Sequence, residues 1–161
     1  MSEGTRPIAT GDEAITELFR ARFDPMVRLA TLLTGSVDTA EELVMDAFAR
    51  VAPRIHEIEQ PPAYLRTAVV NAARSHHRRL RLARRHTPRP EVAVHDPEID
   101  ELWERLDELR PTERACVVLR YYEDLSLDQV AAELDLPVGT VKSHLHRAIS
   151  RLRALLDEED R

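Results

Sequence analysis

The residues best suited to chemistry lie between Leu136 and Leu156, where basic and small polar side chains share one face of a predicted helix. At 100° per residue, Val141, Leu145 and Ala148 fall on one apolar stripe. The opposite face carries Ser143, His146 and Arg147, flanked by Thr140, Lys142 and Arg151. No acidic residue occurs in this segment. Since Arg and Lys bind guanine edges or phosphate, and Ser and His adapt to several groups, this face is a candidate nucleic-acid-binding surface.

Two helices and a tight turn are expected to position this face. Ser126 and Gln129 form a capping box, so a helix should begin at Leu127. It should stop near Asp135, because Pro137 lacks an amide donor and restricts the residue before it. A second helix is expected to restart by Thr140. A short helix, a tight turn and a second helix with a basic outer face indicate a helix-turn-helix. An ordinary helical hairpin with a solvated basic face is the alternative.

The distribution of charge supports a polyanionic partner although the net charge is −6. Residues 60–90 contain eight Arg, three His and no acid, and residues 136–156 contain four Lys or Arg and no acid. The formal charges of these two windows sum to +12, which leaves a net charge of −18 for the remainder of the chain. Basic islands on an acidic chain are where a nucleic acid would bind.

Composition favours an all-α fold. Hydrophobic residues make up 43% of the 161 residues, there are four glycines, and no long alternating Val/Ile/Thr run occurs. Pro88 and Pro90 mark a linker between two small helical domains, the second ending in the helix-turn-helix. The expected organisation is a flexible N-terminus at 1–11, a first domain at 12–85, a linker at 86–96, a second domain at 97–156 and an acidic tail at 157–161.

The upstream helices have distinct surfaces. Asp38 with Glu41 predicts a capping box that opens a helix through Ala52, with an acidic face that is solvated or meets a partner. A long helix should start near Pro61, and from Arg74 onward it is basic nearly all round, so that end is either solvated or bound to an anion. Its apolar side is predicted to consist of Tyr64, Leu65, Ala68, Val69 and Ala72.

Further expectations concern the second half of the chain and the cell compartment. Asp96 is predicted to cap a helix that has Pro97 in its first turn, and Thr112 to cap the next one. Cys116, the single cysteine, rules out an intramolecular disulfide and is expected to be a buried packing thiol. No apolar stretch nears 18 residues, so a cytoplasmic protein without membrane insertion is expected.

Nothing in the sequence indicates an enzyme. His76 with His77, and His144 with His146, have the wrong helical spacing to chelate a metal as an i,i+4 pair would. No nucleophile with a base and no phosphate-binding loop is present. We therefore predict no catalytic residue, no metal site and no cofactor.

Three segments, in order and spacing, resemble sigma-70 family RNA polymerase sigma factors of the extracytoplasmic-function group. They are DTAEELVMDAFARV, AYLRTAVVNAARSHHRR and LRPTERACVVLRYYEDLSLDQVAAELDLPVGTVKSHLHRAISRLR. The likeness covers about residues 12–156. It implies a subunit that binds core RNA polymerase and directs transcription initiation by reading the −35 and −10 elements of promoter DNA. It leaves an anti-sigma protein as a further candidate partner.

The resemblance also implies roles for individual residues. Core polymerase docking would fall to Glu41, Glu42, Leu43 and Asp46. The −10 element would be read and held by Asn71, Arg74, Ser75, Arg78 and Arg79, with the loop 54–60 shaping a pocket for a flipped base. The −35 element would face Lys142, Ser143, His146 and Arg147, with Thr140 and Arg151 beside them.

Two other functions compete with this interpretation. A free-standing helix-turn-helix regulator would explain residues 97–156 but would leave the acidic and Arg-rich helices without a role. A sigma-like module that binds polymerase or an anti-sigma protein without reading DNA would require both basic islands to be incidental. Start sites formed with core polymerase distinguish these possibilities.

Overall fold

The computed structural model describes residues 11–83 and 97–159, and all regular structure in these residues is helical. The predicted all-α class is confirmed. The elements are α1 (Gly11–Thr34), α2 (Val37–Val51), a 3₁₀ turn η1 (Ala52–Arg54), α3 (Pro61–Ala83), α4 (Pro97–Asp107), α5 (Pro111–Val117), a π-helical turn η2 (Val118–Tyr122), α6 (Leu127–Leu134) and α7 (Val138–Glu159).

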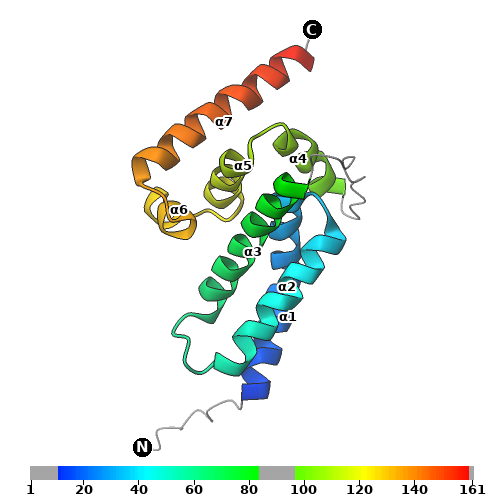
Figure 1. Ribbon diagram of the computed structural model, residues 1–161, viewed down its shortest axis with the longest axis vertical. Coiled ribbons are helices and arrows are strands. Elements are labelled where there is room, and N and C mark those ends of the chain that lie inside the picture. Colours follow the sequence, from blue (N-terminus) through cyan, green and yellow to red (C-terminus); the bar gives the residue numbers. More distant parts are fainter. Residues whose placement is uncertain (1–10, 84–96, 160–161) are drawn as a thin grey trace, which may run out of the picture.

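Helices α1, α2 and α3 lie lengthwise against one another in the lower part of the molecule, and α4 to α7 gather above them (Figure 1). Completely buried aliphatic side chains hold each group together. In the first group they include Met26, Leu29, Val44, Leu65 and Val69. In the second they include Leu119, Val130, Leu134 and Val141. Burial of such side chains contributes about 1.5–3 kcal/mol each, so these stripes fix the helix faces.

Helix α2 begins two residues earlier than the sequence predicted. Its N-cap is Ser36, whose Oγ accepts a hydrogen bond from the Thr39 amide at 3.2 Å. Asp38 lies within the first turn, so the predicted capping box of Asp38 and Glu41 is wrong. Ser36 takes the cap because it follows Gly35, which ends α1 at φ +79° and turns the chain. The helix also ends one residue short of the prediction, and a 3₁₀ turn follows.

The predicted helix-turn-helix forms as expected. Ser126 Oγ accepts from the Gln129 amide at 3.1 Å, and Gln129 Oε1 accepts from the Ser126 amide at 2.8 Å, which confirms the capping box. Asp135 adopts the left-handed conformation at φ +53° and ends α6. Helix α7 starts at Val138, directly after Pro137.

Two other local predictions are wrong. The N-cap of α5 is Arg110, because Pro111 occupies the first helical position, and the Glu113 carboxylate accepts from the Arg110 amide at 3.4 Å in place of a Thr112 cap. Tyr64 is 42% exposed and does not belong to the apolar side of α3. The fully buried residues of that side are Leu65, Val69, Val70 and Ala73.

The two groups of helices contact each other along two seams. The end of α1 packs against α4 and α5, and α3 packs against α6. Buried residues of both groups form one contiguous cluster.

The predicted connecting and terminal segments are described only in part. Gly11, expected in the N-terminal segment, is the first residue of α1, and residues 157–159 of the expected tail belong to α7. The remainder of both segments lies outside the described residues. So does the predicted linker 86–96 with its predicted cap, Asp96.

Candidate nucleic-acid interface

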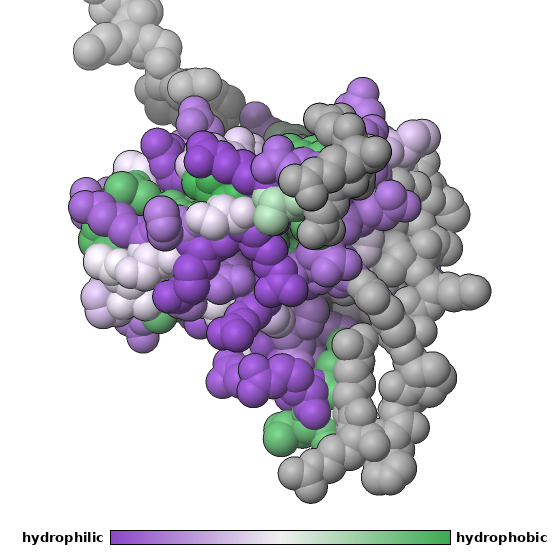
Figure 2. Space-filling model, turned by 90° about the horizontal axis from the view of Figure 1, so that it is seen from above, coloured by the Kyte–Doolittle hydropathy of each residue, from purple (hydrophilic) through white to green (hydrophobic). Residues whose placement is uncertain are grey.

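The outer face of α7 presents the residues that the sequence indicated. Val141, Leu145 and Ala148 are buried on the opposite side, against α5 and α6. Seen from the end of the molecule where α7 lies, the surface formed by the described residues is mainly hydrophilic (Figure 2). Thr140 is half-buried, and the exposed members of the face are Lys142, Ser143, His146, Arg147 and Arg151. The face is therefore open to a polar partner.

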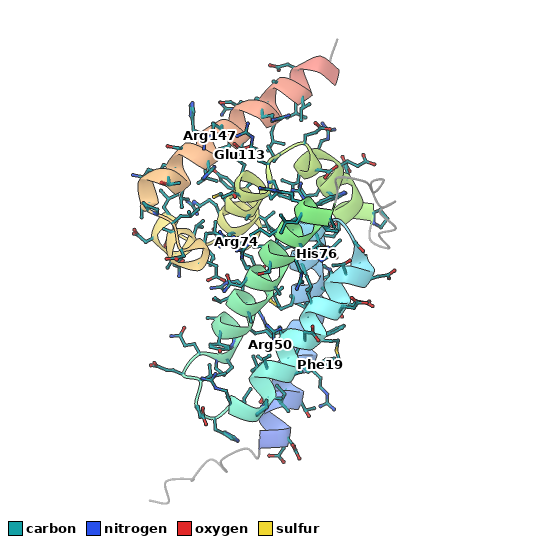
Figure 3. All side chains as sticks on the ribbon, in the orientation of Figure 1. Phe19, Arg50, Arg74, His76, Glu113 and Arg147 are labelled. Atoms are coloured by element: carbon teal, nitrogen blue, oxygen red, sulfur yellow. The ribbon has the colours of Figure 1, made fainter. Side chains whose placement is uncertain are left out.

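Arg147 differs from the other basic residues of this face because its guanidinium is oriented by α5. Its Nε lies 3.3 Å from Glu113 Oε1, and its Nη2 lies 2.9 Å from His144 Nδ1. The Glu113 side chain is 6% exposed, whereas that of Arg147 is 55% exposed. The two residues adjoin in the view of the side chains (Figure 3). One edge of the guanidinium is thus occupied within the protein, which fixes the direction in which its remaining N–H groups can reach a binding partner.

His144 is shifted toward its neutral form. Burial lowers its pKa below the usual value of 6.5, and the Arg147 charge lowers it further, although Glu113 opposes this. A neutral imidazole can accept the Arg147 N–H at Nδ1, in agreement with their contact. His144 therefore supports Arg147 and adds little positive charge of its own.

A pocket of ≈ 480 Å³ lies between α2 and α3 and brings together three of the residues predicted to bind the −10 element. Asn71, Ser75 and Arg79 line it from successive turns of α3. Tyr64, about two turns before Asn71, lines the same wall, and the α2 wall includes Arg50. An aromatic ring, an amide and a guanidinium around one hollow can stack a base and bind its polar edge.

The two remaining residues of that predicted set lie elsewhere on α3. Arg78 is exposed, and its Nη2 lies 3.5 Å from Ser75 Oγ. Arg74 is half-buried, and its Nη1 donates a hydrogen bond of 2.9 Å to the Leu134 carbonyl at the end of α6. In this arrangement Arg74 serves the contact between the two groups of helices.

The acidic face of α2 is also exposed. Glu41, Glu42 and Asp46 are solvent-exposed, and Met45 between them is 51% exposed. Leu43, predicted with them as a docking residue, is 9% exposed and lies in the core and at the edge of the pocket. An apolar side chain within a polar rim is typical of a protein-binding surface.

Sequence reasoning missed several residues around these surfaces. Arg50 could have been found, because it follows Asp46 by four residues and so shares its face. Glu113 and Arg114 are buried and ion-paired, although charged residues in a sequence are ordinarily assigned to the surface. Their burial becomes apparent only when α5 is seen packed against the neighbouring helices.

The described residues were compared with the requirements of a metal site and of a membrane-spanning helix. Within 11–83 and 97–159 there is no group of three His, Cys, Asp or Glu side chains that could hold a metal ion. No helix in the same ranges is long and apolar enough to cross a membrane. Cys116 is buried as predicted, and burial raises the pKa of its thiol to about 11.

Comparison with known proteins gives a consistent result. The family model "Sigma-70, region 4" matches residues 99–152. The RNA polymerase sigma-E factor of Streptomyces coelicolor is 35% identical over 153 residues, which cover 89% of this chain and 86% of that protein. The ECF RNA polymerase sigma factor RpoE of Cereibacter sphaeroides is 30% identical, with 88% of this chain and 86% of that protein covered.

A solved structure has the same fold. The sigma factor RpoE of Bartonella quintana, determined in complex with the anti-sigma factor NepR, superposes with a TM-score of 0.75 at 24% identity. The match covers 88% of this chain and 96% of that one.

Proposed function

The chain belongs to the extracytoplasmic-function group of sigma-70 family RNA polymerase sigma factors, and from this membership we propose how its own residues divide the work of promoter recognition. As a sigma factor it binds core RNA polymerase and directs transcription initiation, without a catalytic step of its own. It acts where the polymerase and the chromosome are, in the cytoplasm. A protein inhibitor of the anti-sigma kind is a candidate partner.

The pocket between α2 and α3 is the observation that carries the −10 assignment. A base extruded from the duplex needs a ring to stack on and a polar group at its edge, and extrusion costs a few kcal/mol. Tyr64 supplies an exposed ring, and Asn71 supplies an amide that is suited to an adenine edge. Arg79 at the same wall is placed to hold a phosphate of the flipped nucleotide.

The α7 face reads the −35 element. In a helix-turn-helix the second helix lies in the major groove. Lys142, Ser143 and His146 are exposed in its N-terminal half, and Arg147 projects from the same face with its guanidinium oriented by Glu113. A good bidentate contact supplies about 1–3 kcal/mol of discrimination, so several contacts in both elements are needed to offset base extrusion.

The acidic face of α2 docks on core polymerase. Glu41, Glu42 and Asp46 surround Met45, which gives the surface an apolar centre and a charged rim. Leu43 contributes from beneath, because its burial fixes the position of α2. Charge complementarity at such a surface sets the rate and orientation of association.

One experiment tests the function as a whole: the purified chain is added to core polymerase with a genomic promoter library, and start sites are mapped. Defined start sites are expected. Their absence, together with DNA binding in the absence of polymerase, would favour a free-standing regulator. Binding to polymerase without start sites would indicate a module that does not read DNA.

Matched variants assign the separate surfaces. Lys142→Ala should shift −35 preference, whereas Arg153→Ala, exposed on the same helix, should not. Glu42→Arg should weaken association with core polymerase, and Glu17→Arg on α1 is the control with the same change of charge. Asn71→Ala should weaken −10 recognition at unchanged −35 preference. The −35 assignment would be refuted if Lys142→Ala and Arg153→Ala had the same −35 preference. The docking assignment would be refuted if Glu42→Arg and Glu17→Arg bound core polymerase equally well. Normal −10 recognition by Asn71→Ala would refute the −10 assignment.

A further inference from the structure

The guanidinium of Arg147 is held by two other side chains of the protein. Its Nε donates to Glu113 Oε1 at 3.3 Å, and its Nη2 donates to His144 Nδ1 at 2.9 Å. Glu113 belongs to α5, and His144 lies about one turn before Arg147 on α7. Figure 3 shows Arg147 and Glu113 side by side where α7 passes α5. Because the two contacts come from different helices, they restrict the guanidinium to one orientation.

The Glu113 carboxylate is itself fixed in place. Its side chain is 6% exposed, and its Oε2 accepts from the Arg110 amide at 3.4 Å. A buried carboxylate that loses its cation is strongly destabilising, so Glu113 retains Arg147 as its partner. Arg147 therefore gives up rotamer freedom when the protein folds, and this freedom need not be lost again when a ligand binds.

His144 can supply the second contact in one protonation state only. A guanidinium has no acceptor, so His144 Nδ1 must accept, and the ring proton must lie on Nε2. Burial lowers the pKa of His144 and the Arg147 charge lowers it further, which favours this neutral ring although Glu113 opposes the shift. His144 therefore acts as an acceptor for Arg147 and not as a further cation.

The N–H groups that remain on Arg147 lie at the outer end of its guanidinium. They belong to Nη1 and Nη2, and Nη1 has no hydrogen-bond partner among the residues that the structure describes. The side chain is 55% exposed on the outer face of α7. Adjacent donors in a fixed position match the paired acceptors O6 and N7 that a guanine presents in the major groove.

Arg151, about one turn after Arg147 on the same face, lacks such a restraint. It is exposed and forms no ion pair within residues 11–83 and 97–159. A cation that is free to move can follow a phosphate, whereas a base edge is read by a donor in a defined place. Pairing with Glu113 also offsets the charge of Arg147, so Arg147 adds little to the general attraction between this face and DNA.

We propose that Glu113 and His144 are positioning residues for base recognition, which hold Arg147 so that it discriminates between bases at one position of the −35 element. Neither of them needs to touch the base. The proposal rests on the proposed function, because the base belongs to the −35 element. It goes further by making discrimination depend on a buried residue of α5, outside the helix-turn-helix.

The restraint is measured first, in the free chain and without DNA. Nitrogen-15 relaxation of the arginine Nε–H groups in nuclear magnetic resonance reports how freely each side chain moves. The order parameter of Arg147 should exceed that of Arg153, which is exposed on the same helix. It should fall in Glu113→Ala and in His144→Ala, and stay high in Glu108→Ala, a control at an exposed glutamate. An Arg147 side chain as mobile as that of Arg153 overturns the proposal.

Base preference is measured second, with core polymerase and promoters that carry every base pair in turn at each −35 position. Arg147→Ala identifies the position that Arg147 reads. At that position Glu113→Ala and His144→Ala should each lower the preference for the best base by about three- to tenfold, and preference elsewhere in the element should be unchanged. His144→Asn, whose side-chain oxygen can replace Nδ1 as the acceptor, should keep the preference, and so should Glu108→Ala.

A purely structural role of Glu113 gives a different result. Glu113→Ala would then slow initiation from every promoter by the same factor and leave base preference intact, which overturns the proposal. In the Arg147→Ala chain, adding Glu113→Ala should leave base preference unchanged, because no guanidinium remains to be oriented. A further loss of preference in that double variant contradicts the proposal.

The His144 variants test the proposal without the buried glutamate. If circular dichroism shows that Glu113→Ala does not fold, His144→Ala and His144→Asn decide the outcome. Full base preference in His144→Ala, or equal loss in His144→Ala and His144→Asn, overturns the role of His144 as the acceptor that positions Arg147.

Failure of the proposed function is a separate outcome. If the unchanged chain forms no start sites with core polymerase, the proposed function is wrong, and the mobility of Arg147 in the free chain still decides whether Glu113 and His144 restrain it. If start sites form but Arg147→Ala changes preference at no −35 position, the proposed function stands and the positioning proposal is overturned.

Discussion

Arg147 Nε lies 3.3 Å from Oε1 of Glu113, a carboxylate that is almost fully buried beneath the candidate −35 face. The pair links the surface of α7 to the N-terminal turn of α5, where the other oxygen of Glu113 accepts from the Arg110 amide. Arg147 therefore has a structural role in addition to the proposed role in DNA recognition. Loss of initiation in an Arg147 variant has to be separated from loss of stability.

The first prediction separates these two roles. Arg147→Ala should lower the free energy of unfolding by about 1 kcal/mol, since it leaves a buried carboxylate unpaired while the lost partner is itself half exposed. Glu113→Gln in the Arg147→Ala chain should recover most of that loss, and urea denaturation of the unchanged chain, the two single variants and the double variant gives the coupling. Arg153→Ala is the control, and an Arg147→Ala chain of the same stability as this control would contradict the prediction.

Gly35 provides the second prediction. Gly35→Ala should lower the free energy of unfolding by about 2–4 kcal/mol, because alanine is strained at φ +79° and its Cβ would lie 2.2 Å from Trp103 Cζ2. Gly139→Ala is the control: a Cβ there meets no atom within 4 Å, so no loss is expected. Thermal melting followed by circular dichroism measures both. Trp103→Phe in the Gly35→Ala chain should recover part of the loss, and equal melting of Gly35→Ala and the unchanged chain would show that the close approach is absent.

The start of α2 provides the third prediction. Ser36→Ala should cost about 1 kcal/mol, because the hydroxyl that accepts from the Thr39 amide is lost. Asp38→Ala should cost less, since Asp38 lies inside the first turn and contributes only through the helix dipole. Guanidinium denaturation of the two variants decides between the caps. If Asp38→Ala lowered the free energy of unfolding more than Ser36→Ala, Asp38 would be the N-cap, as the sequence predicted.

Local patterns predicted the fold where a signal had a single interpretation. The Ser126 cap and the following Pro137 placed the helix-turn-helix correctly, because capping chemistry and proline geometry act within a few residues. The start of α2 was mispredicted because the cap was assigned to Asp38, whereas Ser36, two residues earlier, is the observed N-cap. A glycine is typical of the residue that ends a helix, but the left-handed turn at Gly35 also places Ser36 at the start of the next helix, and this consequence was not drawn from the sequence.

The candidate site was predictable to the extent that it lies on one helix face. The exposed positions of α7 follow from periodicity alone. The commitment of Arg74 to the Leu134 carbonyl joins residues 60 positions apart, and no local pattern encodes it. The same holds for Arg147 with Glu113, since a buried glutamate is recognised only when the helices around it are in place.

The carboxyl group of Glu123, which lies close to Arg66 of α3 and Glu133 of α6, provides the last prediction. Burial raises the pKa of its carboxyl above the usual 4.5, and Glu133 raises it further, while Arg22 on α1 and Arg66 on α3 lower it. Since the folded-state pKa is the higher one, protonation favours the folded state. The stabilising contribution of the protonated form is complete below about pH 4.5 and is lost as pH rises through the raised value.

At neutral pH the ionised Glu123 therefore bears a desolvation cost that a neutral amide avoids. Glu123→Gln should be more stable than the unchanged chain at pH 7.5, and the difference should shrink as the pH falls toward 4.5. Urea denaturation across this range measures the difference. The control is Asp124→Asn, because this neighbour is exposed and asparagine tolerates its positive φ. A Glu123→Gln chain that is less stable at pH 7.5 would show that attraction to Arg22 and Arg66 outweighs burial at this carboxylate.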